Sequence, residues 1–322
     1  MTPDRTQPLR LAGVDIGTLT CRLLIADVPT DGRLTELRSE RRILRLGEGV
    51  DQTKQLSVAA MDRVIQCLKE WRELVDAVHV DAMVVVATSA VRDATNRDEF
   101  LNRVKLEAGF EIELISGEEE ARRTLLGIRS GLPYSVTDVL ALDIGGGSIE
   151  FILDRPGQPP IVRSIDIGVV RLCERTLHHD PPTDDEVHQA REWVARETTA
   201  AVADMGNFQA ATFVGTAGTI TSLAAMAQKL TTYEPARIHN YRLQLTTIQE
   251  LEQTLLSRKK ADRTGLPGLE KGREEVIAAG AIIIRTIMET LGVSAVLVSD
   301  LGLREGVVID QVTRTRSLKQ RS

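Results

Sequence analysis

Aromatic side chains and excess positive charge are both scarce in this sequence of 322 residues. Aromatic residues make up 3% of the chain, which argues against a protein that binds bases or sugar rings by stacking them on aromatic side chains. The formal net charge is −6, from 40 Lys and Arg against 46 Asp and Glu, whereas a general nucleic-acid coat protein would be basic. We therefore expect no nucleic-acid partner.

Long apolar runs and a cysteine framework are missing as well. The longest apolar run, 276-VIAAGAIII-284, is far shorter than the roughly 20 residues of a membrane span, so it predicts a buried helix or strand and no membrane partner. Residues 1–10 hold no apolar stretch of a signal peptide. Cys21, Cys67 and Cys173 are odd in number and lack metal-ligand spacing. These absences predict a reduced, cytoplasmic chain.

The length and the pattern of apolar residues predict a two-domain α/β protein. A chain of this length is long enough to form two compact domains. Apolar residues at helical spacing over 58–78 predict a helix capped by Ser57, and Thr183 begins another. Ser116 with Glu119 reads as a capping box. Strands alternate with these helices, which is typical of an α/β fold with mixed sheets.

One internal repeat stands out. Residues 11-LAGVDIGTLTCRLLIAD-27 and 139-VLALDIGGGSIEFILD-154 each have an apolar run, then Asp-Ile-Gly, then a turn and a second apolar run. This layout predicts a β-hairpin in both places. Two related halves are the structural interpretation, and two turns that face one ligand are the functional one.

The turn of the second hairpin, 143-DIGGGSIE-150, has residues suited to phosphate and a metal. Successive glycines let backbone N–H groups approach phosphate oxygens closely. Asp143 and Glu150 supply carboxylates for Mg²⁺, which usually keeps several waters, and Ser148 adds a hydroxyl. A flexible hairpin without a ligand is the alternative reading of this segment alone.

The first hairpin turn makes the phosphate hypothesis more specific. Asp15 is a second carboxylate at a strand end, Thr18 and Thr20 supply hydroxyls, and Arg22 supplies a cation. Two such turns facing each other would hold a phosphate chain and one metal. A third glycine turn, 215-GTAGT-219, joins a strand to a helix whose first N–H groups suit an anion. A plain strand-to-helix turn is the alternative there.

Three acidic residues open the helix at 116-SGEEEARR-123. Acidic residues in a first helical turn commonly complement the helix dipole. One carboxylate near a bound phosphate could instead orient or deprotonate water. The spacing leaves open which glutamate would do so.

The chain resembles the exopolyphosphatase/guanosine pentaphosphate phosphohydrolase family, within the superfamily of actin, Hsp70 and sugar kinases. The segments that carry the resemblance are 14-VDIGTLTCRLLIA-26, 87-ATSAVRDA-94, 114-LISGEEEAR-122, 142-LDIGGGSIE-150, 168-GVVRLCE-174, 215-GTAGTIT-221 and 299-SDLGLREG-306. The resemblance implies two ribonuclease H-like, actin-like ATPase domains, with mixed sheets flanked by helices and an active site in the interdomain cleft. Residues 1–125 with 303–322 would form the first domain, and 126–302 the second.

The resemblance also implies roles for individual residues. Glu120, directly before Ala121 and Arg122, would be the catalytic glutamate that orients the attacking water. Asp143 and Glu150, with Asp15, would hold Mg²⁺, and K⁺ as a stimulating ion is left open. Together, the residues and the resemblance make the predicted phosphate-binding set Asp15, Gly17, Thr18, Thr20, Arg22, Arg92, Gly145, Gly146, Gly147, Ser148, Gly215, Gly218 and Arg273.

The chain departs from the family pattern in three places. Leu19 replaces the usual Asn of the first turn, which predicts the loss of one polar contact to phosphate. Asn240 replaces the Gly of a His-Gly-Tyr-Arg segment. The helical C-terminal extension of longer members does not follow residue 322, which puts long-polymer binding and processivity in question.

The leading hypothesis is a Mg²⁺-dependent exopolyphosphatase that removes the terminal phosphate of inorganic polyphosphate. Hydrolysis of guanosine pentaphosphate is the alternative, and the low aromatic content favours polyphosphate slightly. A non-catalytic sensor of polyphosphate or of guanosine tetra- or pentaphosphate is a different class. Leu19 is the feature that supports the sensor hypothesis, while the presence of Glu120, Asp143 and Glu150 argues against it. The oligomeric state is open, with a homodimer as one option.

Overall fold

The computed structural model describes residues 8–29 and 34–319. Residues 1–7, which are part of the segment 1–10 from which the absence of a signal peptide is predicted, lie outside this part. The chain divides into two compact units, Met1–Ser130 with Gly302–Ser322, and Gly131–Leu301. The sequence-based division after residue 125 falls inside helix α5 (Gly117–Gly131). The units divide close to the end of that helix, because the turns of a continuous helix stay together.

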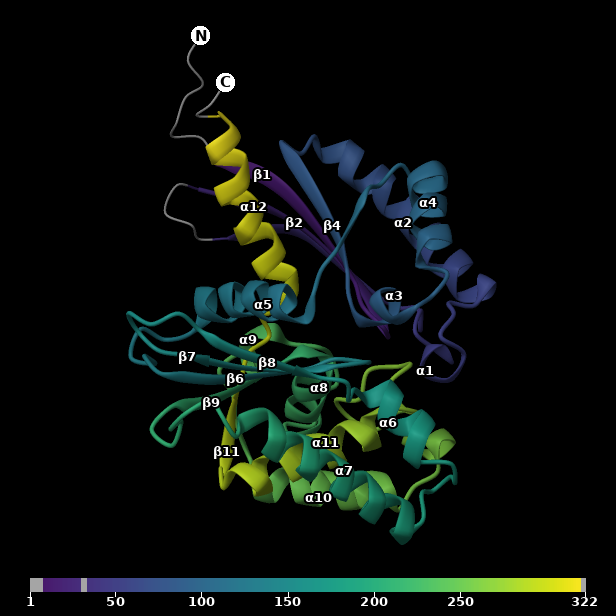
Figure 1. Cartoon of the computed structure of the whole chain (residues 1–322), viewed down its shortest axis with the longest axis vertical. Coiled ribbons are helices and arrows are strands. Elements are labelled where there is room, and N and C mark those ends of the chain that lie inside the picture. The colour runs from purple at the N-terminus through teal and green to yellow at the C-terminus, as the bar shows by residue number, and fades with distance from the viewer. Residues whose placement is uncertain (1–7, 30–33, 320–322) are drawn as a thin grey trace. The chain divides into compact units, whose positions relative to one another are not determined.

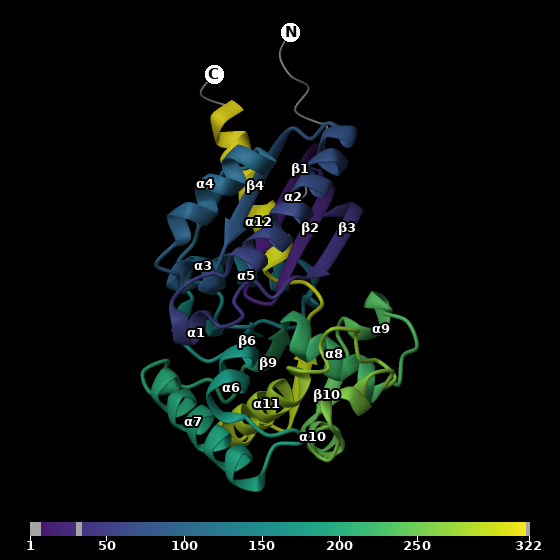
Figure 2. The same ribbon diagram turned by 90° about the vertical axis from the view of Figure 1, so that its right-hand side faces the viewer.

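The sheet of the first unit has the strand order β3-β2-β1-β4-β5. Its strands are β1 (Leu9–Ile16), β2 (Thr20–Val28), β3 (Thr35–Ile43), β4 (Ala82–Ala87) and β5 (Ile112–Leu114). The first three strands are antiparallel, and β4 and β5 continue the sheet in parallel from β1. Figure 2 shows β3 beside β2, at the edge of this sheet.

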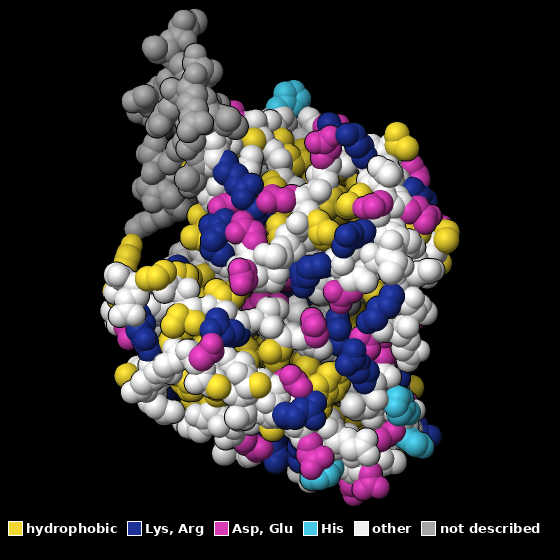
Figure 3. Space-filling view, viewed as in Figure 1, with side chains coloured by type: hydrophobic (Ala, Val, Ile, Leu, Met, Phe, Trp, Pro, Cys, Tyr) yellow, Lys and Arg dark blue, Asp and Glu magenta, His cyan; other side chains and the backbone are white. Residues whose placement is uncertain are grey.

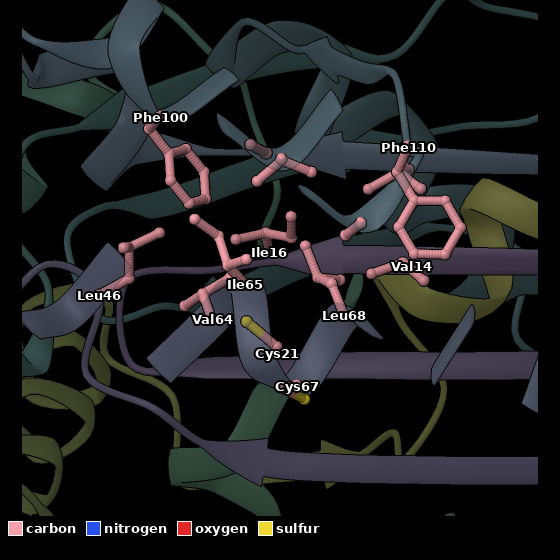
Figure 4. Packing of buried hydrophobic residues seen from close by; sticks show 14 of the residues in the cluster. Val14, Ile16, Cys21, Leu46, Val64, Ile65, Cys67, Leu68, Phe100 and Phe110 are labelled. Atoms are coloured by element: carbon pink, nitrogen blue, oxygen red, sulfur yellow. The ribbon is translucent and has the colours of Figure 1, made fainter. Parts of the chain in front are cut away.

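Helices cover the two faces of this sheet. Helices α2 (Val58–Val78) and α4 (Arg97–Ala108) pack on one face, and α12 (Leu303–Lys319) lies along the other (Figure 1). Figure 4 shows the first face, where Ile16 and Cys21 of the sheet meet Val64 and Leu68 of α2. The short helices α1 (Val50–Thr53) and α3 (Ser89–Asp93) lie in the same unit. Side chains on both faces of β1 are therefore buried, since helices cover the sheet on each side.

Helices α5 and α12 touch through their backbones. A Cβ atom added at Gly306 would overlap the carbonyl oxygen of Arg123, and one added at Gly127 would overlap that of Gly302. Arg123 and Gly127 are one helical turn apart on α5, as are Gly302 and Gly306 at the start of α12. The glycine spacing of 299-SDLGLREG-306 thus has a packing reason, since any side chain would force the helices apart.

The sheet of the second unit has the strand order β10-β11-β9-β6-β7-β8. Its strands are β6 (Val139–Ile144), β7 (Ile149–Asp154), β8 (Ile161–Ile165), β9 (Thr212–Thr216), β10 (Arg242–Gln244) and β11 (Ala295–Val298). As in the first unit, a hairpin and a third antiparallel strand are joined by two parallel strands, here β9 and β11, and β10 adds an antiparallel strand at the edge. The predicted hairpins at 11–27 and 139–154 are confirmed as β1–β2 and β6–β7.

Besides the short 3-10 helix Lys260–Arg263, the described residues of the second unit form six α-helices. They are α6 (Val169–Thr176), α7 (Asp184–Val202), α8 (Ala217–Ala227), α9 (Pro235–Ile238), α10 (Leu245–Leu256) and α11 (Ile277–Leu291). Residues 277–284 of the apolar run form the buried first half of α11, as expected of a helical segment that is apolar all round. Within the described ranges, no helix is long and apolar enough to cross a membrane.

Most cap predictions are confirmed. Ser57 accepts a hydrogen bond from the Ala60 N–H, and Thr183 forms a complete capping box with Glu186. At α5 only half of the predicted box forms, because Ser116 accepts from the Glu119 N–H while the Glu119 carboxylate bonds to arginines. The predicted α/β class with two mixed sheets flanked by helices is confirmed. On the face seen in Figure 3, acidic and basic side chains are interspersed.

Candidate functional site

The first glycine turn is tightly closed. The Gly17 N–H donates to the Thr20 carbonyl at 3.0 Å, joining the ends of β1 and β2. The hydroxyl of Thr18 is buried and hydrogen-bonded to that of Ser89 at 2.8 Å. A Cβ atom at Gly47 would overlap the Thr18 methyl group. Ser89 and Gly47 therefore support the turn, a role that sequence reasoning missed because both lie far away in the chain.

Leu19 is part of the packing of this turn. Its side chain is 6% exposed, and its carbonyl accepts hydrogen bonds from the N–H groups of Leu44 and Arg45, both at 2.9 Å. The segment 44–47 thus holds the turn through backbone bonds. The departure from the family pattern places an apolar side chain where it is buried.

Because Leu19 is buried, Leu19→Asn should destabilise the protein without raising turnover. The substitution removes apolar burial and adds a buried amide, which together cost about 2–4 kcal/mol. Urea unfolding and steady-state assays measure the two effects. Leu37→Asn, at an exposed position of β3, is the control and should change stability by less than about 0.5 kcal/mol. A faster Leu19→Asn enzyme of unchanged stability would instead place this side chain against substrate.

Two charged residues face each other beside the turn. Asp15 at the end of β1 is buried, and the register places it opposite Arg22 on β2. Arg22 is partly buried and has no hydrogen bond or ion pair within residues 8–29 and 34–319. A guanidinium without a protein partner is available to an anion.

Arg92 and Glu120 meet at the same end of this sheet, beyond the carboxyl ends of β4 and β5. Arg92 of α3 donates to the Ile115 carbonyl at 2.9 Å, and its Nη1 lies 3.5 Å from Oε2 of Glu120. Glu120, in the first turn of α5, is 8% exposed. The sequence assigned these residues separately to phosphate binding and to catalysis. The structure brings the cation and the carboxylate together.

The three glutamates at the start of α5 have different surroundings. Glu118 is exposed. Glu119 accepts bidentate hydrogen bonds from Arg122 at 2.7 and 2.8 Å. These bonds, and then that from Arg123, lower the pKa of Glu119 to about 2. With Glu119 committed to arginines and Glu118 in solvent, Glu120 is the one of the three that is both buried and beside a phosphate-binding candidate.

A network of charged residues holds this first turn of α5. Arg123 is 1% exposed and bonds to Glu119 at 2.7 Å and to Glu113 of β5 at 2.6 Å. Asp310 of α12 bonds to Arg122 at 2.6 Å. Since the partners come from three elements, the network fixes the start of the helix, and with it the backbone of Glu120.

In the second unit, the glycine turn is hydrogen-bonded to the first residues of helix α6. The Gly145 N–H donates to the Ser148 carbonyl at 3.0 Å, while Val169 and Val170 donate to the carbonyls of Gly145 and Gly146 at 3.1 and 2.9 Å. A Cβ atom at Gly168 would overlap the backbone of Gly146 and Gly147. Gly168 therefore supports this turn. The segment 168-GVVRLCE-174 contributes to the family resemblance, but the sequence alone predicted no role for Gly168.

Asp143 and Glu150 stand directly opposite each other on β6 and β7. They are 7% and 1% exposed, and Ser164 donates to Glu150 at 2.9 Å. Like charges opposed across strands repel, and a divalent cation would offset that repulsion. In the described ranges no group of three or more His, Cys, Asp and Glu could hold a metal. Two carboxylates nevertheless fit Mg²⁺, which takes one or two and keeps waters.

The third glycine turn and Arg273 lie together in this unit. A Cβ atom at Gly218 would overlap the guanidinium of Arg273, so that group lies against the start of α8. Arg273 is buried, and its Nε donates to Glu270 at 2.7 Å. Ala217, directly before Gly218, has φ of 71°, a left-handed conformation that is costly for alanine. Gly215 has a packing reason as well, since an added Cβ would lie 2.8 Å from Val296.

The chain is similar to proteins of known family over nearly its whole length. Residues 24–315 match the family model described as the Ppx/GppA phosphatase family. Exopolyphosphatase 2 of Mycobacterium tuberculosis is 37% identical over 314 residues, covering 93% of this chain and 98% of that protein. The Aquifex aeolicus member of the Ppx/GppA family aligns with a TM-score of 0.80 at 34% identity, over 96% of this chain and 99% of that one. An exopolyphosphatase structure from Cytophaga hutchinsonii aligns with a TM-score of 0.87 at 27% identity, over 95% and 98%.

Proposed function

This chain belongs to the Ppx/GppA phosphatase family, and on that premise we propose that it is an exopolyphosphatase that releases the terminal phosphate of inorganic polyphosphate. Its two units have the actin-like fold of that family, and it is a hydrolase. The observation that carries the proposal is the placement of Glu120, which is buried beside Arg92 in the first turn of α5.

In the proposed reaction, Glu120 accepts a hydrogen bond from the attacking water and aligns it with the terminal phosphorus. Arg92 lies close enough to this carboxylate to bind an oxygen of the same phosphate through its guanidinium fork. Phosphoryl transfer requires positioning and charge neutralisation more than covalent help from the protein. The carboxylate of Glu120 and the guanidinium of Arg92 are therefore the groups that the first unit needs to position water and to bind the phosphate.

The second unit supplies the remaining groups of the proposal. Asp143 and Glu150 are proposed to hold Mg²⁺, and Asp15 as a metal ligand remains a prediction from the sequence. When bound, Mg²⁺ would neutralise charge on the phosphate oxygens. The backbone of Gly145, Gly146, Gly147 and Ser148 and the Gly218–Arg273 pair are proposed to bind phosphate. K⁺ as a stimulating ion, a homodimer and a cytoplasmic location remain predictions from the sequence.

Phosphate release from polyphosphate and from guanosine pentaphosphate, measured side by side with Mg²⁺, tests the function. Faster release from polyphosphate is expected. Preference for the nucleotide would transfer the assignment to guanosine pentaphosphate hydrolysis. Tight binding of either compound without release would make the chain a sensor.

Asp143→Asn tests the metal assignment. Losing one charged ligand should raise the Mg²⁺ concentration for half-maximal activity by about 10–100-fold, because such a contact contributes roughly 1.5–3 kcal/mol. Asp154→Asn, at the far end of the same hairpin, is the control and should leave the titration unchanged. An unaltered Mg²⁺ titration in Asp143→Asn would remove this residue from the metal site.

A further inference from the structure

The segment that carries Arg273 has little regular structure of its own. Residues 257–276 join helix α10 to helix α11, and within them the 3-10 helix Lys260–Arg263 is the one regular element. Three residues of the segment have positive φ and all are glycines, namely Gly265, Gly268 and Gly272. The position of such a segment depends on the side chains that bind its backbone groups.

Arg263 is the side chain that binds this segment most extensively. It is 1% exposed, whereas the basic residues 258–260 just before it are exposed. Each nitrogen of its guanidinium donates to a backbone carbonyl: Nε to Leu255 at 3.1 Å, Nη1 to Glu274 at 2.9 Å and Nη2 to Arg258 at 3.0 Å. A buried cation requires such acceptors, because a charged group without hydrogen bonds is costly to bury.

The three carbonyls lie at the two ends of the segment. Leu255 is in the last turn of α10 and Arg258 lies just beyond it. Carbonyls at the end of a helix lack partners within the helix, and a cation there is favoured by the helix dipole. Glu274 directly follows Arg273. The guanidinium of Arg263 therefore ties the backbone beside Arg273 to the end of α10.

The segment touches helix α8 at both of its ends. A Cβ atom at Gly268 would overlap the backbone of Ala225, near the end of α8, and the guanidinium of Arg273 lies against Gly218 at its start. The bond from Arg273 to Glu270, at 2.7 Å, fixes the arginine side chain only relative to its own segment. The placement of Arg273 at the start of α8 therefore depends on where the whole segment is held.

We propose that Arg263 is a positioning residue for the reaction, whose three hydrogen bonds hold the backbone beside Arg273 so that the Arg273 guanidinium stays at the start of α8. Arg263 itself binds no phosphate in this proposal, since it is buried and each of its nitrogens already donates to a carbonyl. The role of Arg273 in binding phosphate rests on the proposed function.

Two substitutions of Arg263 and one matched control test the proposal. Arg263→Lys keeps the charge, but one ammonium group cannot replace a planar fork that reaches carbonyls at both ends of the segment. Arg263→Met removes the charge and leaves no unpaired cation in the interior, so it provides a folded variant where the lysine is not tolerated. Arg258→Lys is the control, because it changes an exposed side chain of the same segment and keeps the carbonyl that Arg263 binds.

Equilibrium dialysis of inorganic tripolyphosphate against the full-length chain measures binding without turnover. Arg263→Lys and Arg263→Met should bind roughly tenfold more weakly than the parent chain, and kcat/KM for polyphosphate should fall by a similar factor. Arg258→Lys should stay within about twofold of the parent in both measurements. Parent-like binding by a folded Arg263 variant would overturn the proposal.

A double-mutant cycle with Arg273→Gln distinguishes positioning from a general structural role. If Arg263 acts through Arg273, adding Arg263→Met to Arg273→Gln should weaken tripolyphosphate binding by less than about twofold further. A further loss of about tenfold, or parent-like binding by Arg273→Gln alone, would overturn the proposal. If the parent chain releases phosphate from neither polyphosphate nor guanosine pentaphosphate, the proposed function fails, whereas this coupling in binding still supports the positioning role.

Discussion

Glu120→Gln should lower the turnover of polyphosphate by about 10²–10⁴-fold, the range for lost acid–base assistance. The amide has nearly the shape of the carboxylate but cannot take a proton from water. Arg92 keeps its 2.9 Å hydrogen bond to the Ile115 carbonyl, so its position should survive the change. Phosphate release at saturating substrate measures the loss, and dialysis of tripolyphosphate should show binding close to that of the parent chain.

Glu118→Gln is the matched control for this change. It removes a carboxylate from the same helical turn at an exposed position, so turnover should stay within about twofold of the parent. Near-normal turnover in Glu120→Gln would falsify its assignment as the residue that orients water. An equal loss in both variants would point to the charge of the helix start instead.

Gly306→Ala should lower the free energy of unfolding of the first unit by more than about 4 kcal/mol, or prevent its folding. The added methyl group would overlap the Arg123 carbonyl, which belongs to a helix backbone and has no room to move. The two helices would have to separate, breaking the contacts of Arg122 with Asp310 and of Arg123 with Glu119 and Glu113. The urea midpoint followed by circular dichroism measures the effect.

The same displacement should reduce activity in any Gly306→Ala protein that folds, because Glu120 begins the displaced helix. Gly127→Ala, one turn along α5 against Gly302, should act in the same direction. Gln311→Ala on α12 is the control, and its stability should stay within about 0.5 kcal/mol of the parent. An unchanged urea midpoint in Gly306→Ala would mean that the helices do not touch through their backbones.

Local patterns in the sequence were sufficient for many elements. The helix over 58–78 and its cap at Ser57 are confirmed, as is the capping box of Thr183 and Glu186. Helix spacing and caps are set by residues three or four apart, so a single chain reveals them. The Ser116 box formed only in part, because arginines on other turns competed for the Glu119 carboxylate.

The sequence by itself determined the repeated hairpins, the α/β class, the family and the candidate residues, because each rests on neighbours in the chain or on a motif. Only the tertiary structure decided which of these residues meet. Arg92 reaches Glu120 across 28 positions, Arg123 meets Gly306 from another helix, and Arg263 donates to the carbonyl of Glu274 beside Arg273. Such pairs depend on strand order and helix packing, which bring distant residues together through the burial of surfaces that no local pattern records.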